Sequence, residues 1–129
     1  MLDTNICIFV MRGLGPALAS RFDAEADRLC ISTVTLAELS HGVEKSAAQD
    51  RNRRALEGFV ALLSVLSFDP GAAAAYGALR SDLERRGSVI GPYHMMIAAH
   101  AHSLGLVVVT NNRREFDRVR GLALEDWSA

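Results

Sequence analysis

The chain has 129 residues, half of them hydrophobic, and a formal net charge of −1. This length is typical of one domain with a buried core, so we expect a single domain over residues 1–129. The balanced charge excludes an overall basic coat for nucleic acid, no apolar run is long enough for a membrane span, and the first residues lack the basic start of a signal peptide.

Short apolar runs alternate with segments of helical periodicity along the chain. In chain order we expect a short strand at residues 1–3, a helix at 15–26, a strand at 28–33, helices at 33–46 and 51–63, a strand in the second half of 62–68, helices at 71–87 and 91–105, a strand at 105–110 and a short strand at 122–127. The segment 91–105 is apolar nearly all round, which predicts a central, buried helix. The alternation predicts an α/β fold with a parallel sheet that carries helices on both faces.

Three carboxylates fall where such a sheet places its active site, beyond the carboxyl ends of the strands. Asp3 ends the first strand, Glu38 lies in the helix after residues 28–33, and Glu115 follows residues 105–110. Clustered carboxylates repel one another unless a cation lies between them, and hard oxygen ligands favour Mg²⁺ or Mn²⁺. Such an ion activates water and stabilises charge on a phosphodiester, so this set is typical of a nuclease.

Each of these acids also has a purely structural interpretation. Thr35, as the residue that begins its helix, forms a capping box with Glu38, and Asn112 with Glu115 fits a looser form of the same motif. Asp3 could cap a helix that begins near Asn5. The structural interpretation is the stronger one for each acid alone, and the functional one gains weight only if all three meet at one rim of the sheet.

Five stretches together resemble the toxins of the VapC type, which are ribonucleases of the PIN-domain family. They run in the order of that family from residue 1 to about residue 127: MLDTNICIF, ISTVTLAELSHGVEKS, RNRRALEGFVALLSVLSFD, GSVIGPYHMMIAAHA and GLVVVTNNRREFDRVRGLALEDW. The resemblance implies a three-layer α/β/α sandwich with a central parallel sheet. It also implies cleavage of RNA, with tRNA as the substrate class, that depends on Mg²⁺ or Mn²⁺. The implied partners are a second copy of the toxin and a small VapB-like antitoxin, which brings the pair to operator DNA, all in the cytoplasm.

The resemblance assigns roles residue by residue. Its metal-binding acids correspond to Asp3, Glu38 and Glu115, and the fourth ligand position corresponds to His94. Supporting positions correspond to Thr4, Asn5, Asp82 and Thr110, although a solvated position among neighbouring charges explains Asp82 equally well. We expect the four ligand positions to line one cavity.

His94 departs from the pattern of the family, which carries aspartate at this position. The residue lies in the first turn of the helix that Pro92 begins, where the helix dipole favours an acid. Imidazole removes a negative charge and a hard oxygen ligand, and it suits Mg²⁺ poorly. We therefore expect impaired activity, with a neutral His94 hydrogen-bonded to Asp3 or Glu38 in the space of the metal; a working site that contains histidine is the alternative.

The remaining candidates carry weaker signals. Cys7 and Cys30 show no metal-ligand spacing and indicate buried thiols in a reducing cytoplasm. His100 is expected to pack or hydrogen-bond, and Trp127 to pack the end of the chain. Among the arginine clusters only Arg113 and Arg114 flank the acidic rim, where they suit RNA phosphates or an acidic antitoxin segment.

Three functions compete at this stage. The leading one is a toxin endoribonuclease impaired by His94, and the first alternative is a non-catalytic PIN scaffold that acts with its antitoxin in an operator-binding complex. A DNA-directed PIN nuclease of the flap type is disfavoured, because the short chain has no insertion through which a DNA end could thread.

Overall fold

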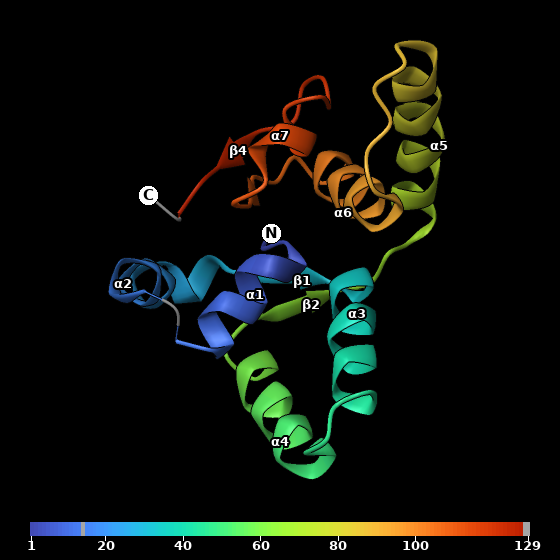
Figure 1. Cartoon of the computed structure of the whole chain (residues 1–129). Coiled ribbons are helices and arrows are strands. Elements are labelled where there is room, and N and C mark those ends of the chain that lie inside the picture. The colour runs from blue at the N-terminus through green and yellow to red at the C-terminus, as the bar shows by residue number, and fades with distance from the viewer. Residues whose placement is uncertain (14, 128–129) are drawn as a thin grey trace.

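The computed structural model describes residues 1–13 and 15–127. Figure 1 shows a layer of helices on each side of a small central sheet. The helices are α1 (Thr4–Met11), α2 (Pro16–Glu25), η1 (Ala26–Arg28, a 3₁₀ turn), α3 (Thr33–Glu44), α4 (Gln49–Val60), α5 (Pro70–Arg85), α6 (Pro92–Ser103) and α7 (Arg113–Phe116), and the strands are β1 (Cys30–Ser32), β2 (Ser64–Leu66), β3 (Val108–Val109) and β4 (Leu124–Glu125).

The sheet is parallel, and the first residues of the chain lie at its centre. β1 pairs with β2 and β3 pairs with β4, both in parallel. Leu2 donates its N–H to the carbonyl of Cys30 at 2.9 Å, and Asp3 donates to the carbonyl of Val109 at 3.0 Å. Residues 1–3 therefore join the two pairs in the order β2, β1, residues 1–3, β3, β4, and the expected parallel sheet is confirmed.

Alternate residues of the central strands face opposite sides of the sheet and enter two separate cores. Leu2, Ile31 and Val109 pack with α1 to α4, whereas their neighbours in sequence belong to the core under α5 to α7. Those neighbours are Met1, Cys30 and Val108. Two cores on the two faces of one sheet constitute the expected three-layer α/β/α sandwich, with α6 as its buried central helix.

The strands are shorter than expected, at two or three residues each. β1 stops at Ser32 because that residue already caps α3: its hydroxyl accepts the N–H of Val34 at 3.0 Å. The helix thus begins two residues before Thr35, and the expected capping box of Thr35 with Glu38 is wrong. Thr35 is instead fully buried within the helix.

Several smaller predictions agree with the structure. Cys7 and Cys30 are buried free thiols, and Trp127 is 5% exposed against the first core. Within residues 1–13 and 15–127, no helix is both long and apolar enough to cross a membrane.

Candidate functional site

Asp3 is the buried centre of the site, at the carboxyl end of the central strand. One carboxylate oxygen caps α1 by accepting the N–H of Ile6 at 2.9 Å, and the other accepts the hydroxyl of Thr110. Burial raises the pKa of Asp3, and the nearby charge of Glu38 adds to the increase, whereas the bonds from Thr110 and Ile6 and the charge of His94 act against it. The expected cap is therefore present, and it fixes a carboxylate that is costly to ionise in this position.

Glu38 lies beside this centre on α3. The hydroxyl of Thr4 donates to its Oε1 atom at 2.6 Å and is also 3.2 Å from the hydroxyl of Thr35. Because Thr4 immediately follows Asp3, the first turn of α1 holds the Glu38 carboxylate next to the Asp3 carboxylate.

Glu115 and His94 form a pair on the other side of Asp3. Nδ1 of His94 is 2.8 Å from Oε2 of Glu115, and both side chains are about a quarter exposed, at 24% and 26%. The other oxygen of Glu115 accepts the N–H of Gly91 at 2.6 Å, and Asn112 donates to Oε2 at 2.9 Å. Burial acts to raise the pKa of Glu115, but the bonds from Gly91 and Asn112 together with His94 lower it.

A hydrogen-bond path connects the two halves of the site. Thr110, directly after β3, donates its hydroxyl to Asp3 and accepts the N–H of Asn112 at 2.8 Å. Asn112 then reaches Glu115 through its side chain. The path runs from Asp3 through Thr110 and Asn112 to Glu115 and His94. It therefore links the end of the first strand to the segments that follow β3 and begin α6.

The partner of His94 differs from the expected one. His94 bonds Glu115 rather than Asp3 or Glu38, because Gly91 and Pro92 set the start of α6 directly over the short helix α7 that carries Glu115. The ring also packs against Phe116, at 5.1 Å between ring centroids. Within residues 1–13 and 15–127, no three His, Cys, Asp or Glu side chains are grouped closely enough to hold a metal ion.

The structure does not bring Asp82 to this site. Its carboxylate accepts two bonds from Arg86, at 2.8 and 3.0 Å, and lies 4.0 Å from Arg120. The hydrogen bond from Arg86 is the main cause of its lowered pKa. Arg86 also donates to the carbonyl of Arg118, so Asp82 fixes the end of α5 to the loop after α7. The ion-pair explanation therefore fits Asp82 better than the supporting role.

A groove of about 950 Å³ opens beside the acids, between α1, α3 and α4. Glu38, Thr4 and the exposed Asn5 line the groove near the acids, and Tyr93 from α6 also lines it. Of the four ligand positions only Glu38 lines the groove, so the expectation that all four line one cavity is wrong. Asp3 is too deeply buried, and Glu115 is held back by its bond to His94.

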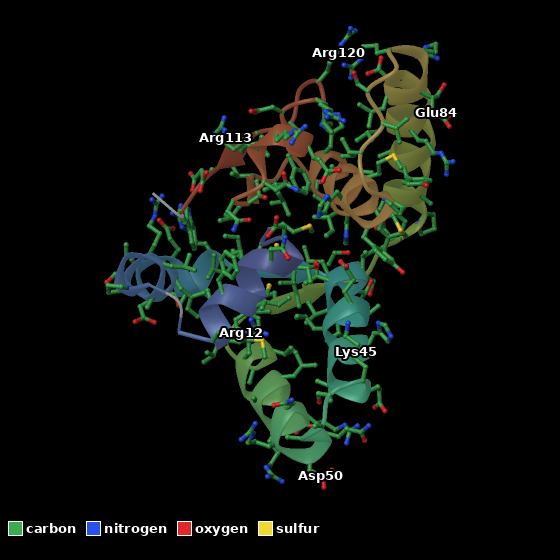
Figure 2. All side chains as sticks on the ribbon, in the orientation of Figure 1. Arg12, Lys45, Asp50, Glu84, Arg113 and Arg120 are labelled. Carbon is green, nitrogen blue, oxygen red and sulfur yellow. The ribbon has the colours of Figure 1, made fainter. Side chains whose placement is uncertain are left out.

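The basic residues divide between two places. Arg113 and Arg114 are exposed on α7, where Arg113 is 3.4 Å from Asp117. Arg12 and Lys45 instead line the groove. Figure 2 shows Arg12 and Lys45 in the layer of α1, α3 and α4, and Arg113 in the opposite layer near α7. Sequence reasoning did not single out the two groove cations.

Gly91 and Asn112 are the site residues that sequence reasoning missed. Gly91 contributes its backbone N–H to Oε1 of Glu115, and a Cβ atom at this position would be in ordinary contact with Nδ1 of His94 at 3.4 Å. The sequence motif predicts that Asn112 caps the helix that carries Glu115. In the structure its side chain makes no capping bond and instead donates to Glu115. Its position three residues before Glu115 was the available signal.

Comparison with known proteins gives consistent matches over nearly the whole chain. The family model described as PIN domain matches residues 1–122. A tRNA(fMet)-specific endonuclease VapC of Salmonella typhimurium is 50% identical over 127 residues, covering 98% of this chain and 96% of that protein. A ribonuclease VapC2 of Haemophilus influenzae is 43% identical over 127 residues, with the same coverage of 98% and 96%.

Solved structures give the same result. A DNA-bound VapBC from Salmonella typhimurium matches with a TM-score of 0.95 and 50% identity, covering 98% of this chain and 96% of that one. VapBC2 from Rickettsia felis, bound to a DNA fragment from its promoter, matches with a TM-score of 0.94 and 35% identity, covering 99% and 98%.

Proposed function

Because the chain belongs to the PIN-domain family, we propose that it is the toxin of a toxin–antitoxin pair and an endoribonuclease impaired by His94. The similarity to proteins named as ribonucleases and as a tRNA(fMet)-specific endonuclease supports RNA, and tRNA within it, as the substrate. The observation that carries the proposal is that Asp3, Glu38 and Glu115 lie at one rim of the parallel sheet and are linked through Thr4, Thr110 and Asn112. We also propose that the protein acts in the cytoplasm, where its proposed RNA substrate is found.

We propose Mg²⁺ or Mn²⁺ as the cofactor, held by Asp3, Glu38 and Glu115, with His94 at the fourth ligand position. The chemistry of the three acids fits such an ion: they offer hard oxygen ligands, and the charges of Glu38 and Asp3 act on each other without a cation between them. His94 does not fit, since its imidazole holds Glu115 at 2.8 Å. A bound ion would supply activation of water and stabilisation of phosphodiester charge.

The surrounding residues orient the acids. Thr110 and the N–H of Ile6 hold both oxygens of Asp3, and Thr4 directs one oxygen of Glu38. Glu115 is fixed by Gly91 and Asn112. Such fixed carboxylates would hold a bound ion in position with little rearrangement, so that the ion could stabilise charge that develops on the phosphate.

His94 weakens this arrangement in two ways. It supplies no negative charge at a position where the helix N-terminus favours an acid. It also binds Glu115 directly, so an ion must compete with the imidazole for that carboxylate. Replacement of His94 by aspartate in an RNA cleavage assay therefore tests the proposal, with tRNA(fMet) as the substrate.

The proposed partner is a VapB-like antitoxin, and operator DNA is reached only through it. Solved relatives are VapBC complexes, two of them with DNA, and this supports the assignment. A cationic side chain offsets clustered carboxylates where a metal does not, so we propose that the antitoxin inserts an arginine beside Glu38. Arg113 and Arg114 are proposed contacts for RNA phosphates or for an acidic antitoxin segment. We also propose a homodimer.

One observation favours a second candidate, a non-catalytic PIN scaffold that forms an operator-binding complex with its antitoxin. His94 bonds Glu115, and the described residues contain no cluster of three ligating side chains. The scaffold function predicts no RNA cleavage with either Mg²⁺ or Mn²⁺, together with unimpaired binding of the antitoxin. Measurement of both properties on the same preparation separates the two candidates.

A further inference from the structure

Tyr93 is an exposed aromatic ring at the edge of the acidic site. It lies in the first turn of α6 between Pro92 and His94, and the fixed φ of Pro92 holds this turn in place. The residue is 53% exposed although it lines the groove together with Glu38 and Thr4. Its hydroxyl makes no hydrogen bond within residues 1–13 and 15–127. Neither burial in the core nor a polar contact therefore accounts for an aromatic residue here.

The groove has an apolar floor that includes Ile8, Met11 and Val43, and its polar residues lie along that floor where they can contact a nucleic-acid strand. Arg12 and Lys45 line it and form none of the ion pairs found in the described part of the chain. Glu38 and Thr4 also line the groove, as does Tyr93. Unpaired cations attract phosphates, and an exposed ring stacks on a base that is free of its own partner. The groove volume of about 950 Å³ has room for more than one nucleotide.

We propose that Tyr93 stacks on an unpaired base of the RNA and so positions the neighbouring phosphate beside Glu38, the acid that lines the groove. Arg12 and Lys45 hold the backbone of the same strand further along the groove. This inference rests on the proposed ribonuclease function, and it adds a substrate-binding residue that does not depend on a metal. It requires single-stranded RNA in the groove, since a base inside a duplex offers no free face.

Binding to the chain with His94 in place tests the inference without catalysis. The probe is a short poly(U) oligonucleotide, and the comparison is an abasic strand of the same length and charge. Tyr93→Ala and Tyr93→Leu are expected to weaken poly(U) binding about tenfold or more, and Tyr93→Phe to keep it within about twofold. Leu104→Ala, at a similarly exposed apolar residue outside the groove, is the matched control. With the abasic strand all variants are expected to bind equally.

Equal poly(U) affinity of all Tyr93 variants, or no binding by the parent chain, would overturn the inference. A loss of antitoxin affinity in Tyr93→Ala without a loss of poly(U) affinity would also overturn it and would make the ring a contact for the antitoxin. Cleavage of tRNA(fMet) by His94→Asp tests the proposed function separately. If that variant is inactive while the Tyr93 variants lose poly(U) binding, the function fails and the stacking role stands.

Discussion

Nδ1 of His94 lies 2.8 Å from Oε2 of Glu115, and this bond joins the first turn of α6 to the short helix α7. In a PIN domain whose fourth ligand position carries an acid, two carboxylates would face each other here and repel. Imidazole instead makes an attractive contact and fixes Glu115 in the absence of a cation. The contact that holds Glu115 here would therefore oppose binding of the proposed metal ion.

Asp3 has two roles that mutations can separate: it caps α1, and its buried carboxylate is a proposed metal ligand. Asp3→Asn keeps an acceptor for the N–H of Ile6 and removes a charge that burial disfavours, so we expect a free energy of unfolding at least equal to that of the parent. Asp3→Ala loses the cap and is expected to lower stability by about 1 kcal/mol or more. Urea unfolding measures both changes.

The activity of the two Asp3 variants should not follow their stability. In the His94→Asp background both are expected to lose RNA cleavage, because neither offers a charged oxygen to the proposed ion. Cleavage by the stable Asp3→Asn variant at the rate of its background would refute a ligand role for Asp3.

His100 is expected to make the fold sensitive to acid. It is 1% exposed, with Nδ1 at 2.8 Å from the hydroxyl of Ser32, and burial lowers its pKa. The unfolded chain then takes up this proton at a higher pH than the folded chain. Stability is therefore full above about pH 6.5 and falls as the pH decreases towards the lowered pKa of the folded state.

His100→Gln is the variant that isolates this contribution. We expect it to show a smaller loss of unfolding free energy than the parent between about pH 7 and about pH 5.5, measured by urea unfolding. Parallel pH profiles for the two proteins would exclude His100 as the source of the acid sensitivity.

The antitoxin should cover the part of the groove near the acids. If it inserts an arginine beside Glu38, hydrogen exchange in the complex is expected to slow in α3 around Glu38 and in α7 around Glu115, relative to the free toxin. The far end of α5 around Glu84, which Figure 2 shows on the outer side of the opposite layer, serves as the internal reference. Protection confined to other segments would contradict the proposed binding mode.

The proposed homodimer is expected to use the exposed helices of the first half of the chain. Leu62, directly after α4, is 58% exposed, which makes it a suitable position to disrupt such an interface. Sedimentation at micromolar concentration, without antitoxin, should give a dimer for the parent chain and a monomer for Leu62→Glu. A parent chain that sediments as a monomer would reject the dimer.

Sequence patterns were sufficient to predict the parallel sheet and the helices on its two faces. Alternation of apolar runs with helical segments predicts the parallel sheet, and the positions of Asp3, Glu38 and Glu115 after strands predict their common rim. The patterns could not give the partner of His94, because that depends on how the start of α6 meets α7 in three dimensions. They also left out Gly91, whose contribution is a backbone N–H that no side-chain motif reveals.

The strand lengths and the helix start at Ser32 were also beyond the sequence patterns. The apolar run in 105–110 begins with Leu106 and Val107, but only Val108 and Val109 pair with β4. Ser32 and Thr35 are both good capping residues, and only the backbone decides which of them uses its hydroxyl.

The most direct test of the account is the rate of tRNA(fMet) cleavage by this chain and by His94→Asp, each in Mg²⁺ and in Mn²⁺. We expect the parent to be slower than the variant by at least about a hundredfold in Mg²⁺, because it lacks a charged oxygen ligand and its Glu115 is held by imidazole. Mn²⁺ should restore part of the parent rate, since it accepts nitrogen ligands more readily. Equal rates in Mg²⁺ would contradict the account, because position 94 would then not be a ligand on which activity depends.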